Sequence, residues 1–343
     1  MKKLLNTLFI TQENTYLSLK GETVVIQVEQ EKIGQIPLLN LEAICTFGYA
    51  GASPSLMGYC AKNNINLTFM NKNGRFLARV VGKSQGNVLL RKAQYRMSDS
   101  EEDSVKIARN MIFGKVSNQR MMLERMMRDY ALRVDVEKLK KASLRMKNSL
   151  KALRACTDLE SLRGIEGQAA SEYFKCFNDL ILSQEESFQF TVRSRRPPLD
   201  MTNALLSFSY TLLASEVGSA LEHVGLDAYV GFLHRDRPGR MSLALDVMEE
   251  LRPLIADRFV LSLINRKEIT PNDFIVKENG AVLLKEASRK EFLKKWQQKK
   301  TETLTHPRLK EKITWGLVPY AQALILARYL RGDSEEYAPF LWR

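Results

Sequence analysis

The sequence is poor in cysteine and has no long apolar run. No two of its four cysteines form a C-x-x-C pair, so neither a disulfide framework nor a zinc knuckle is expected, and we predict four reduced, buried thiols. No stretch approaches the roughly 18 uninterrupted apolar residues of a transmembrane helix. The opening MKKLLNTLFI has a short, interrupted apolar run without a small-residue cleavage site. It therefore predicts a first β-strand rather than a signal peptide, and a cytoplasmic protein.

The sequence also has a deficit of acidic residues. It carries 39 Asp and Glu against 52 Lys and Arg, which gives a net charge of +13 over 343 residues. Such an excess favours a polyanionic partner, with nucleic acid first and an anionic membrane surface second. A hydrophobic fraction of 45% and a charged fraction of 27% are typical of a globular protein, and the length suffices for two domains.

The first part of the chain has the pattern of a β domain. Residues 1 to about 85 contain short runs rich in β-branched and aromatic residues, among them YLSLKG, TVVIQVEQ, INLTFMN and RFLARVVG. Lys72-Asn73-Gly74 is a hairpin signal. Ser53-Pro54-Ser55 should open one short helix that runs to about Lys62. We predict a small β domain over residues 1–85.

From about residue 87 the period changes to that of helices. NVLLRKAQYRM, VEKLKKASLRMKNSLKALRA and YAQALILARYLRG have apolar residues three and four apart with basic residues between them. This spacing is typical of amphipathic helices. We therefore predict an α+β protein in which a larger, all-α domain over residues 86–343 follows the β domain.

Histidine is rare, and the surroundings of His234 are the most informative. After it come a basic Pro-Gly loop and the segment SLALDVMEEL, whose pattern predicts a buried helix. Asp246 and Glu249 would share the narrow polar arc of that helix. Buried paired carboxylates need a compensating cation, and together with an imidazole they suit Mn²⁺ or Mg²⁺. The alternative is a solvated acidic face paired with Arg240 or Arg252, and this segment alone does not separate the two.

A further ligand is suggested by LRGIEGQAASEYF, residues 162–174. Glu166 lies between Gly164 and Gly167, and alanines follow. Small residues permit the close approach of another backbone or of a phosphate chain. The acid is an unusual choice for a helix that only packs. The alternative is an acid that interacts favourably with the positive end of a helix dipole.

The third segment is TVRSRRPPLDMTNALLSFSY. Arg193, Arg195 and Arg196 precede two prolines, which predicts an extended, partly rigid loop. Asp200 or Thr202 can cap the helix that follows. Three arginines before a helix start are suited to holding a phosphate backbone, although any one of them alone is compatible with an ordinary surface loop.

With these segments in order, the chain resembles the CRISPR-associated integrase-endonuclease of the spacer-acquisition module. The matching residues are LRGIEGQAASEYF, RSRRPPLDMTNALLSFSYTLL, GLDAYVGFLH and GRMSLALDVMEELRP. The tail ARYLRGDSEEYAPFLW resembles a type I-C-like branch. The similarity extends over essentially the full chain.

The resemblance implies a fold, a metal site and partners. It implies a β-sandwich-like N-terminal domain for dimerisation and partner contacts, a helical catalytic domain, and a homodimer in complex with a small ferredoxin-like CRISPR-associated protein. It implies a Mg²⁺ or Mn²⁺ site formed by Glu166, His234 and Glu249, with Asp246 as an auxiliary ligand or an acid behind the ligands. Glu250 is then expected to be solvated.

The resemblance also implies a reaction. A 3′-hydroxyl of a short foreign DNA attacks a phosphodiester at a CRISPR repeat, which inserts the fragment into the array for antiviral defence. Water as nucleophile makes the same site an endonuclease. The arginines expected to contact DNA are Arg163, Arg193, Arg195, Arg196, Arg240 and Arg252. The competing hypotheses are a non-catalytic DNA-binding scaffold of the same fold and a metal phosphohydrolase acting on small substrates.

Overall fold

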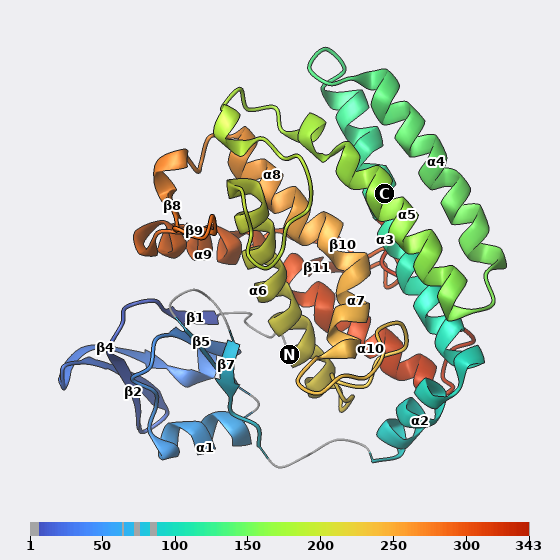
Figure 1. The fold of residues 1–343 in the computed structure, drawn as a ribbon. Coiled ribbons are helices and arrows are strands. Elements are labelled where there is room, and N and C mark those ends of the chain that lie inside the picture. Colours follow the sequence, from blue (N-terminus) through green and yellow to red (C-terminus); the bar gives the residue numbers. More distant parts are fainter. Residues whose placement is uncertain (1–6, 64, 72–75, 83–87, 343) are drawn as a thin grey trace. The chain divides into compact units, whose positions relative to one another are not determined.

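The computed structural model describes residues 7–63, 65–71, 76–82 and 88–342 and divides the chain into two compact units (Figure 1). The first unit comprises Met1–Gln85, Leu284–Glu302 and Thr314–Leu317, and the second comprises Gly86–Leu283, Thr303–Ile313 and Val318–Arg343. The two late segments of the first unit had been assigned from the sequence to the helical domain. A helical repeat gives the buried face of a helix but not the unit against which that face packs.

The first unit contains two sheets. Their strands are β1 (Thr7–Ile10), β2 (Thr15–Lys20), β3 (Thr23–Val28), β4 (Glu31–Pro37), β5 (Ala43–Phe47), β6 (Asn66–Met70) and β7 (Phe76–Arg79). One sheet has the order β1-β5-β6-β7, with parallel pairs β1–β5 and β5–β6 and the antiparallel pair β6–β7. The other is the antiparallel meander β2-β3-β4. The predicted β-rich start of the chain is confirmed.

The two sheets share one core with helix α1 (Pro54–Lys62). Leu17 and Val24 from one sheet, Ile44 from the other and Leu56 from α1 are all fully buried in it. The Ser53 hydroxyl accepts a hydrogen bond from the Leu56 amide, so the predicted opening of this helix is confirmed. The Lys72-Asn73-Gly74 turn and the first residues of the predicted N-terminal strand lie outside the described residues.

The second unit is mainly helical. Its helices are α2 (Val88–Asp99), α3 (Glu101–Asp129), α4 (Val136–Ala155), α5 (Leu159–Lys175), α6 (Met201–His223), α7 (Ser242–Arg252), α8 (Arg258–Asn265) and α10 (Val318–Leu330), whereas α9 (Glu286–Thr301) belongs to the first unit. Short strands pair as β8 (Phe274–Val276) with β9 (Val282–Leu284) and β10 (Thr303–Thr305) with β11 (Lys312–Thr314). The part after residue 86 is therefore predominantly helical, as predicted. It is not all-α, because it also contains these short strands, so that detail of the prediction is wrong.

Helix α3 organises the second unit. At its start, the Ser100 hydroxyl accepts a hydrogen bond from the Asp103 amide. Three acids in its first turn interact favourably with the positive end of the helix dipole. It packs against α4, α5 and α7, while α7 also packs against α6 and α10 (Figure 1). This arrangement brings the Glu166 segment on α5 and the Asp246–Glu249 segment on α7 to the same central helix.

Helix α6 is long and apolar enough to cross a membrane by length and composition alone. However, 56% of its most apolar stretch is buried inside the protein, which is typical of a core helix. At its start, Asp200 Oδ1 accepts a hydrogen bond from the Asn203 amide at 2.7 Å, so Asp200 is the cap that the sequence suggested. The four cysteines are free and buried, which confirms the prediction for the thiols.

Candidate active site and metal centre

Helix α7 is buried over almost its whole circumference. The predicted start at Ser242 is confirmed, and a π-helical turn (Pro253–Asp257) joins α7 to α8. Glu250, which was expected to be solvated, is fully buried, so that prediction is wrong. The apolar pattern indicated one buried face, but α7 has neighbours on several sides, and the acids as well as the apolar residues face the protein interior.

Asp246 holds the His234 loop. Its Oδ2 accepts hydrogen bonds from the amides of Phe232 at 2.6 Å and Leu233 at 2.9 Å, and its Oδ1 accepts one from the His234 amide at 3.0 Å. The same Oδ1 lies 2.5 Å from His234 Nδ1. A Cβ on Gly231 would lie 2.7 Å from Asp246 Oδ2, so only glycine fits this close approach. The carboxylate of Asp246 is thus committed to the loop.

The contact with Asp246 sets the state of His234. Burial, the largest influence, opposes a positive charge on the ring, but the hydrogen bond and the charge of Asp246 raise the pKa of His234 above its ordinary value. Glu249 contributes to this increase, so its carboxylate lies within electrostatic reach of the imidazole. With Nδ1 on the carboxylate, Nε2 is the ring nitrogen that a ligand would use. An acid that orients one ring nitrogen in this way is compatible with a metal ligand at the other nitrogen.

Glu166 and Glu249 meet at a lysine that was not predicted from the sequence. Lys115 Nζ, on α3, contacts Glu166 Oε1 from α5 and lies 2.7 Å from Glu249 Oε2 on α7. Arg252 Nη2 approaches the same Glu249 oxygen at 2.9 Å. Burial would raise the pKa of Glu249, but the positive charges of Arg252 and Lys115 outweigh it and lower the pKa to about 2. Glu249 is therefore ionised at any physiological pH.

A sequence signal for Lys115 exists. It lies four residues after Met111 and eight after Ile107, both fully buried, so it falls on the apolar face of α3. A lysine on a buried helix face needs a compensating acid. The helical repeat could have identified it, but not which acids it meets.

The donor atoms of Glu166, Glu249 and His234 are of the kind that divalent cations bind, but the described side chains do not form a complete metal-binding group. In the part of the chain that the structure describes, no three His, Cys, Asp or Glu side chains converge as a metal-binding group. Glu249 Oε2 is nevertheless buried, and the described groups nearest to it are two cations within ion-pair distance, Lys115 and Arg252. Two carboxylates and an imidazole nitrogen are donors that suit Mg²⁺ or Mn²⁺.

The glycines around Glu166 leave open space. A Cβ added at Gly164 or Gly167 would meet nothing within 4 Å, so no neighbouring backbone uses the room that these residues provide. The carboxyl side chain of Glu166 is 26% exposed, against 9% for Glu249. Glu166 is thus the member of the pair that solvent or a ligand reaches first.

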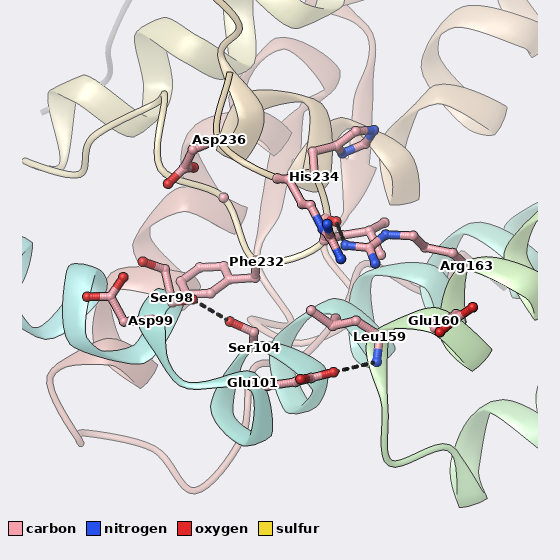
Figure 2. A pocket seen from close by; sticks show the side chains of 13 residues that line it. Ser98, Asp99, Glu101, Ser104, Leu159, Glu160, Arg163, Phe232, His234 and Asp236 are labelled. Carbon is pink, nitrogen blue, oxygen red and sulfur yellow. Dashed lines mark hydrogen bonds between the residues drawn. The ribbon is translucent and has the colours of Figure 1, made fainter. Parts of the chain in front are cut away.

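A polar pocket of about 490 Å³ adjoins His234 (Figure 2). Arg163 lies at the His234 side of it and donates a hydrogen bond to the Leu233 carbonyl at 2.7 Å. Its lining also includes acids of three helices, namely Asp99 of α2, Glu101 of α3 and Glu160 of α5. Glu166 and Glu249 are not part of its lining.

The arginines expected to contact DNA fall into two groups. Arg193 donates to Asn203 Oδ1 at 2.6 Å and to Ser207 Oγ at 3.1 Å, and Arg252 is buried against Glu249. The guanidinium groups of both lie over the ring of Tyr210, at 5.3 and 5.4 Å from its centroid. These two arginines are held by contacts inside the unit.

The remaining arginines are more accessible. Arg195 and Arg196 are exposed, whereas Arg240 and Arg163 are partly buried. Arg240 Nε donates to Ser242 Oγ at 3.3 Å. The loop before α6 therefore presents two of its three arginines to solvent.

Comparison with known proteins identifies the family. Residues 8–298 match the family model described as CRISPR associated protein Cas1. The chain belongs to this family. The CRISPR-associated endonuclease Cas1 1 of Chlorobaculum tepidum is 48% identical over 343 residues, and the CRISPR-associated endonuclease Cas1 2 of Rhodospirillum rubrum is 50% identical over 347 residues. Both alignments cover all of this chain and all of the relative.

Solved structures share the Cas1 fold. A Cas1 protein from Thermotoga maritima has a TM-score of 0.83 at 23% identity, covering 97% of this chain and 99% of the other. A casposase bound to an integration product has the same TM-score and identity, covering 99% and 95%. The β-rich start followed by a larger helical part is therefore the architecture of this family.

Next to Glu249, the buried Glu250 ties α7 to the end of the chain. Its Oε1 accepts hydrogen bonds from the Tyr337 hydroxyl and from Gln322 Nε2 at 2.7 Å, and its Oε2 accepts one from the Phe340 amide at 3.0 Å. Asn118 of α3 donates to the carbonyls of both Glu250 and Phe340. These contacts fix the backbone of α7 at the position of Glu249.

Glu250 should make the stability depend on pH. Burial is the dominant influence and raises its pKa from 4.5 to about 7, despite the donors around it. Between pH 4.5 and about 7, the folded state therefore retains on Glu250 a proton that the unfolded chain has lost. The contribution of this group to the free energy of unfolding is complete below pH 4.5 and falls by up to ~3 kcal/mol as the pH rises to 7.

The matched variant is Glu250→Gln, which cannot ionise. We expect the wild type to lose stability relative to this variant between pH 4.5 and 7 in urea unfolding experiments. A difference between the two proteins that does not change with pH over this range would contradict the assignment.

Proposed function

We propose that this protein is a metal-dependent DNA endonuclease and integrase that inserts short foreign DNA fragments into a CRISPR array. One observation carries the proposal. Glu166 and Glu249, from separate helices, converge on a single buried cation, and His234 is oriented by Asp246 within electrostatic reach of Glu249. Membership of the Cas1 family and the endonuclease names of its relatives support it.

In this proposal, Glu166, Glu249 and His234 Nε2 hold a Mg²⁺ or Mn²⁺ ion. When bound, such an ion polarises the scissile phosphate and lowers the pKa of the attacking hydroxyl. Asp246 keeps the imidazole turned, and Arg252 keeps Glu249 ionised and in place. Asp246 accepts four contacts from the His234 loop, so its role is to orient His234 rather than to bind the metal.

The proposed substrate is DNA. The exposed Arg195 and Arg196 are suited to contacting a phosphate backbone, and the open space at Gly164 and Gly167 leaves room for one beside Glu166. The net charge of +13 favours the same ligand. Because such binding releases counterions, the affinity for DNA should fall steeply with added salt.

The proposed assembly is a cytoplasmic homodimer in complex with a small ferredoxin-like CRISPR-associated protein. Solved relatives of the same fold include a Cas6-RT-Cas1–Cas2 complex, with a TM-score of 0.82. We assign the N-terminal unit to dimerisation and partner contacts. We also retain the type I-C-like branch as a proposal, based on the C-terminal tail ARYLRGDSEEYAPFLW.

The test is a reaction with labelled duplex DNA and a repeat-bearing plasmid, with Mn²⁺ or Mg²⁺ or with EDTA. We expect cleaved and joined products with metal and none with EDTA. DNA binding that is unaffected by EDTA, without any product, would indicate the non-catalytic scaffold. Turnover of a nucleotide monomer together with inactivity on long DNA would indicate the small-substrate phosphohydrolase.

A further inference from the structure

Lys115 lies at the centre of the candidate metal site, although it is not one of the proposed ligands. Its side chain is completely buried. It reaches from α3 between a carboxylate of α5 and a carboxylate of α7, contacting Glu166 Oε1 and lying 2.7 Å from Glu249 Oε2. The ammonium group therefore contacts the two carboxylates to which we assign the metal ion.

This arrangement exceeds what a structural ion pair requires. A buried ammonium is costly unless it is paired, and one carboxylate is enough to pair it. Here a second carboxylate approaches the same nitrogen, and Glu249 has a second cation of its own in Arg252, at 2.9 Å. The two acids are thus balanced by two side-chain cations. A divalent ion that joins them without an added anion leaves an excess of positive charge.

We propose that Lys115 is a built-in counter-cation, which occupies the carboxylate pair when metal is absent and which a divalent ion must displace. The inference rests on the proposed function, because it assumes that these carboxylates bind metal. It follows that Lys115 weakens metal binding in the free protein. A DNA phosphate offsets the excess positive charge, so metal and DNA should bind cooperatively at this site.

The test uses Lys115→Met, which removes the charge and the terminal nitrogen and keeps an unbranched apolar side chain one atom shorter. The dissociation constant for Mn²⁺ is measured on the full chain by isothermal titration calorimetry, without DNA. Because the competing positive charge is gone, we expect Lys115→Met to bind Mn²⁺ at least about 10-fold more tightly than the wild type. A lysine that only supports the structure would have the opposite effect, because its loss would loosen the site and weaken binding.

A matched control is Lys106→Met on the same helix. Lys106 pairs with Glu102 and Asp103 at the surface, and its replacement should leave the Mn²⁺ affinity unchanged. If Lys115→Met does not fold, Lys115→Gln removes the same charge while its amide still donates to a carboxylate. The same increase in affinity is expected for it.

The outcomes separate this inference from the proposed function. Equal or weaker Mn²⁺ binding by the folded Lys115 variant, with Mn²⁺ binding by the wild type intact, overturns the counter-cation alone. Absence of Mn²⁺ binding in both proteins overturns the metal-dependent function, and the counter-cation with it. Tighter binding by the variant, without a change in Lys106→Met, supports both.

Discussion

Replacing His234 with alanine should lower the rates of DNA cleavage and strand transfer by about 10²- to 10³-fold while the protein stays folded. Loss of a metal ligand removes several kcal/mol of transition-state stabilisation, and each tenfold in rate corresponds to about 1.4 kcal/mol. The fold should tolerate the change, because the His234 side chain is 30% exposed and Asp246 keeps its three backbone donors.

The matched control is His223→Ala. His223 lies at the end of α6, where its Nδ1 is 3.0 Å from the Ser219 carbonyl of the same helix. Its replacement should leave the rates unchanged. Both variants are compared by single-turnover rates and by circular dichroism melting. Wild-type activity in His234→Ala would remove His234 from the site.

Replacing Asp246 with alanine should have the largest combined effect on stability and activity. The change leaves the buried amides of Phe232 and Leu233 and the partly buried amide of His234 without their acceptor. Unsatisfied buried donors cost about 1–3 kcal/mol each, so we expect a loss of roughly 3–5 kcal/mol in the free energy of unfolding. Without Asp246 the imidazole of His234 is no longer held in one orientation, which should also lower the affinity for metal by about 10- to 100-fold.

The control for this second variant is Asp236→Ala. Asp236 lies on the same loop but is exposed. Its replacement should change the free energy of unfolding by no more than about 0.5 kcal/mol. Urea unfolding of both variants, with Mn²⁺ titration of the folded fraction, gives the comparison. If Asp246→Ala were as stable as Asp236→Ala, the proposed anchoring of the loop would be wrong.

Much of the fold follows from local patterns in the sequence. The change from short β-branched runs to three- and four-residue spacing separates the β-rich start from the helical part, and the caps at Ser53 and Asp200 are local hydrogen bonds. The location of residues 284–302 in the first unit depends on contacts far apart in the chain. The short strands after residue 270 are similarly hidden, because three residues are too few to show an alternating pattern.

The candidate site could be predicted only in part. The α7 segment alone left a metal site and a solvated acidic face equally possible, and the resemblance to a family selected Glu166, His234 and Glu249. The difference between Asp246 and Glu249 depends on which backbone amides surround each acid, and sequence spacing does not contain this information. Glu250 was misjudged for the same reason, since its partners Tyr337 and Phe340 lie about 90 residues further along the chain.

The loop before α6 contains arginines of two kinds that look alike in the sequence. Arg193 and Arg195 are two residues apart and chemically identical, yet the first is held by Asn203 and Ser207 whereas the second is exposed. The partners that hold Arg193 lie on α6, ten and fourteen residues further along the chain, so the composition of the loop alone cannot separate structural arginines from those available to a ligand. Arg195→Ala is thus a more informative probe of DNA contact than Arg193→Ala.

The most direct test of the central claim is a strand-transfer reaction in which the wild type and Glu249→Ala are run side by side. A labelled duplex with a free 3′-hydroxyl, a repeat-bearing plasmid, the small partner protein and Mn²⁺ are supplied to both. We expect labelled plasmid with the wild type, none when EDTA replaces Mn²⁺, and none with Glu249→Ala that remains folded. Equal joining by the wild type and by Glu249→Ala would contradict the central claim.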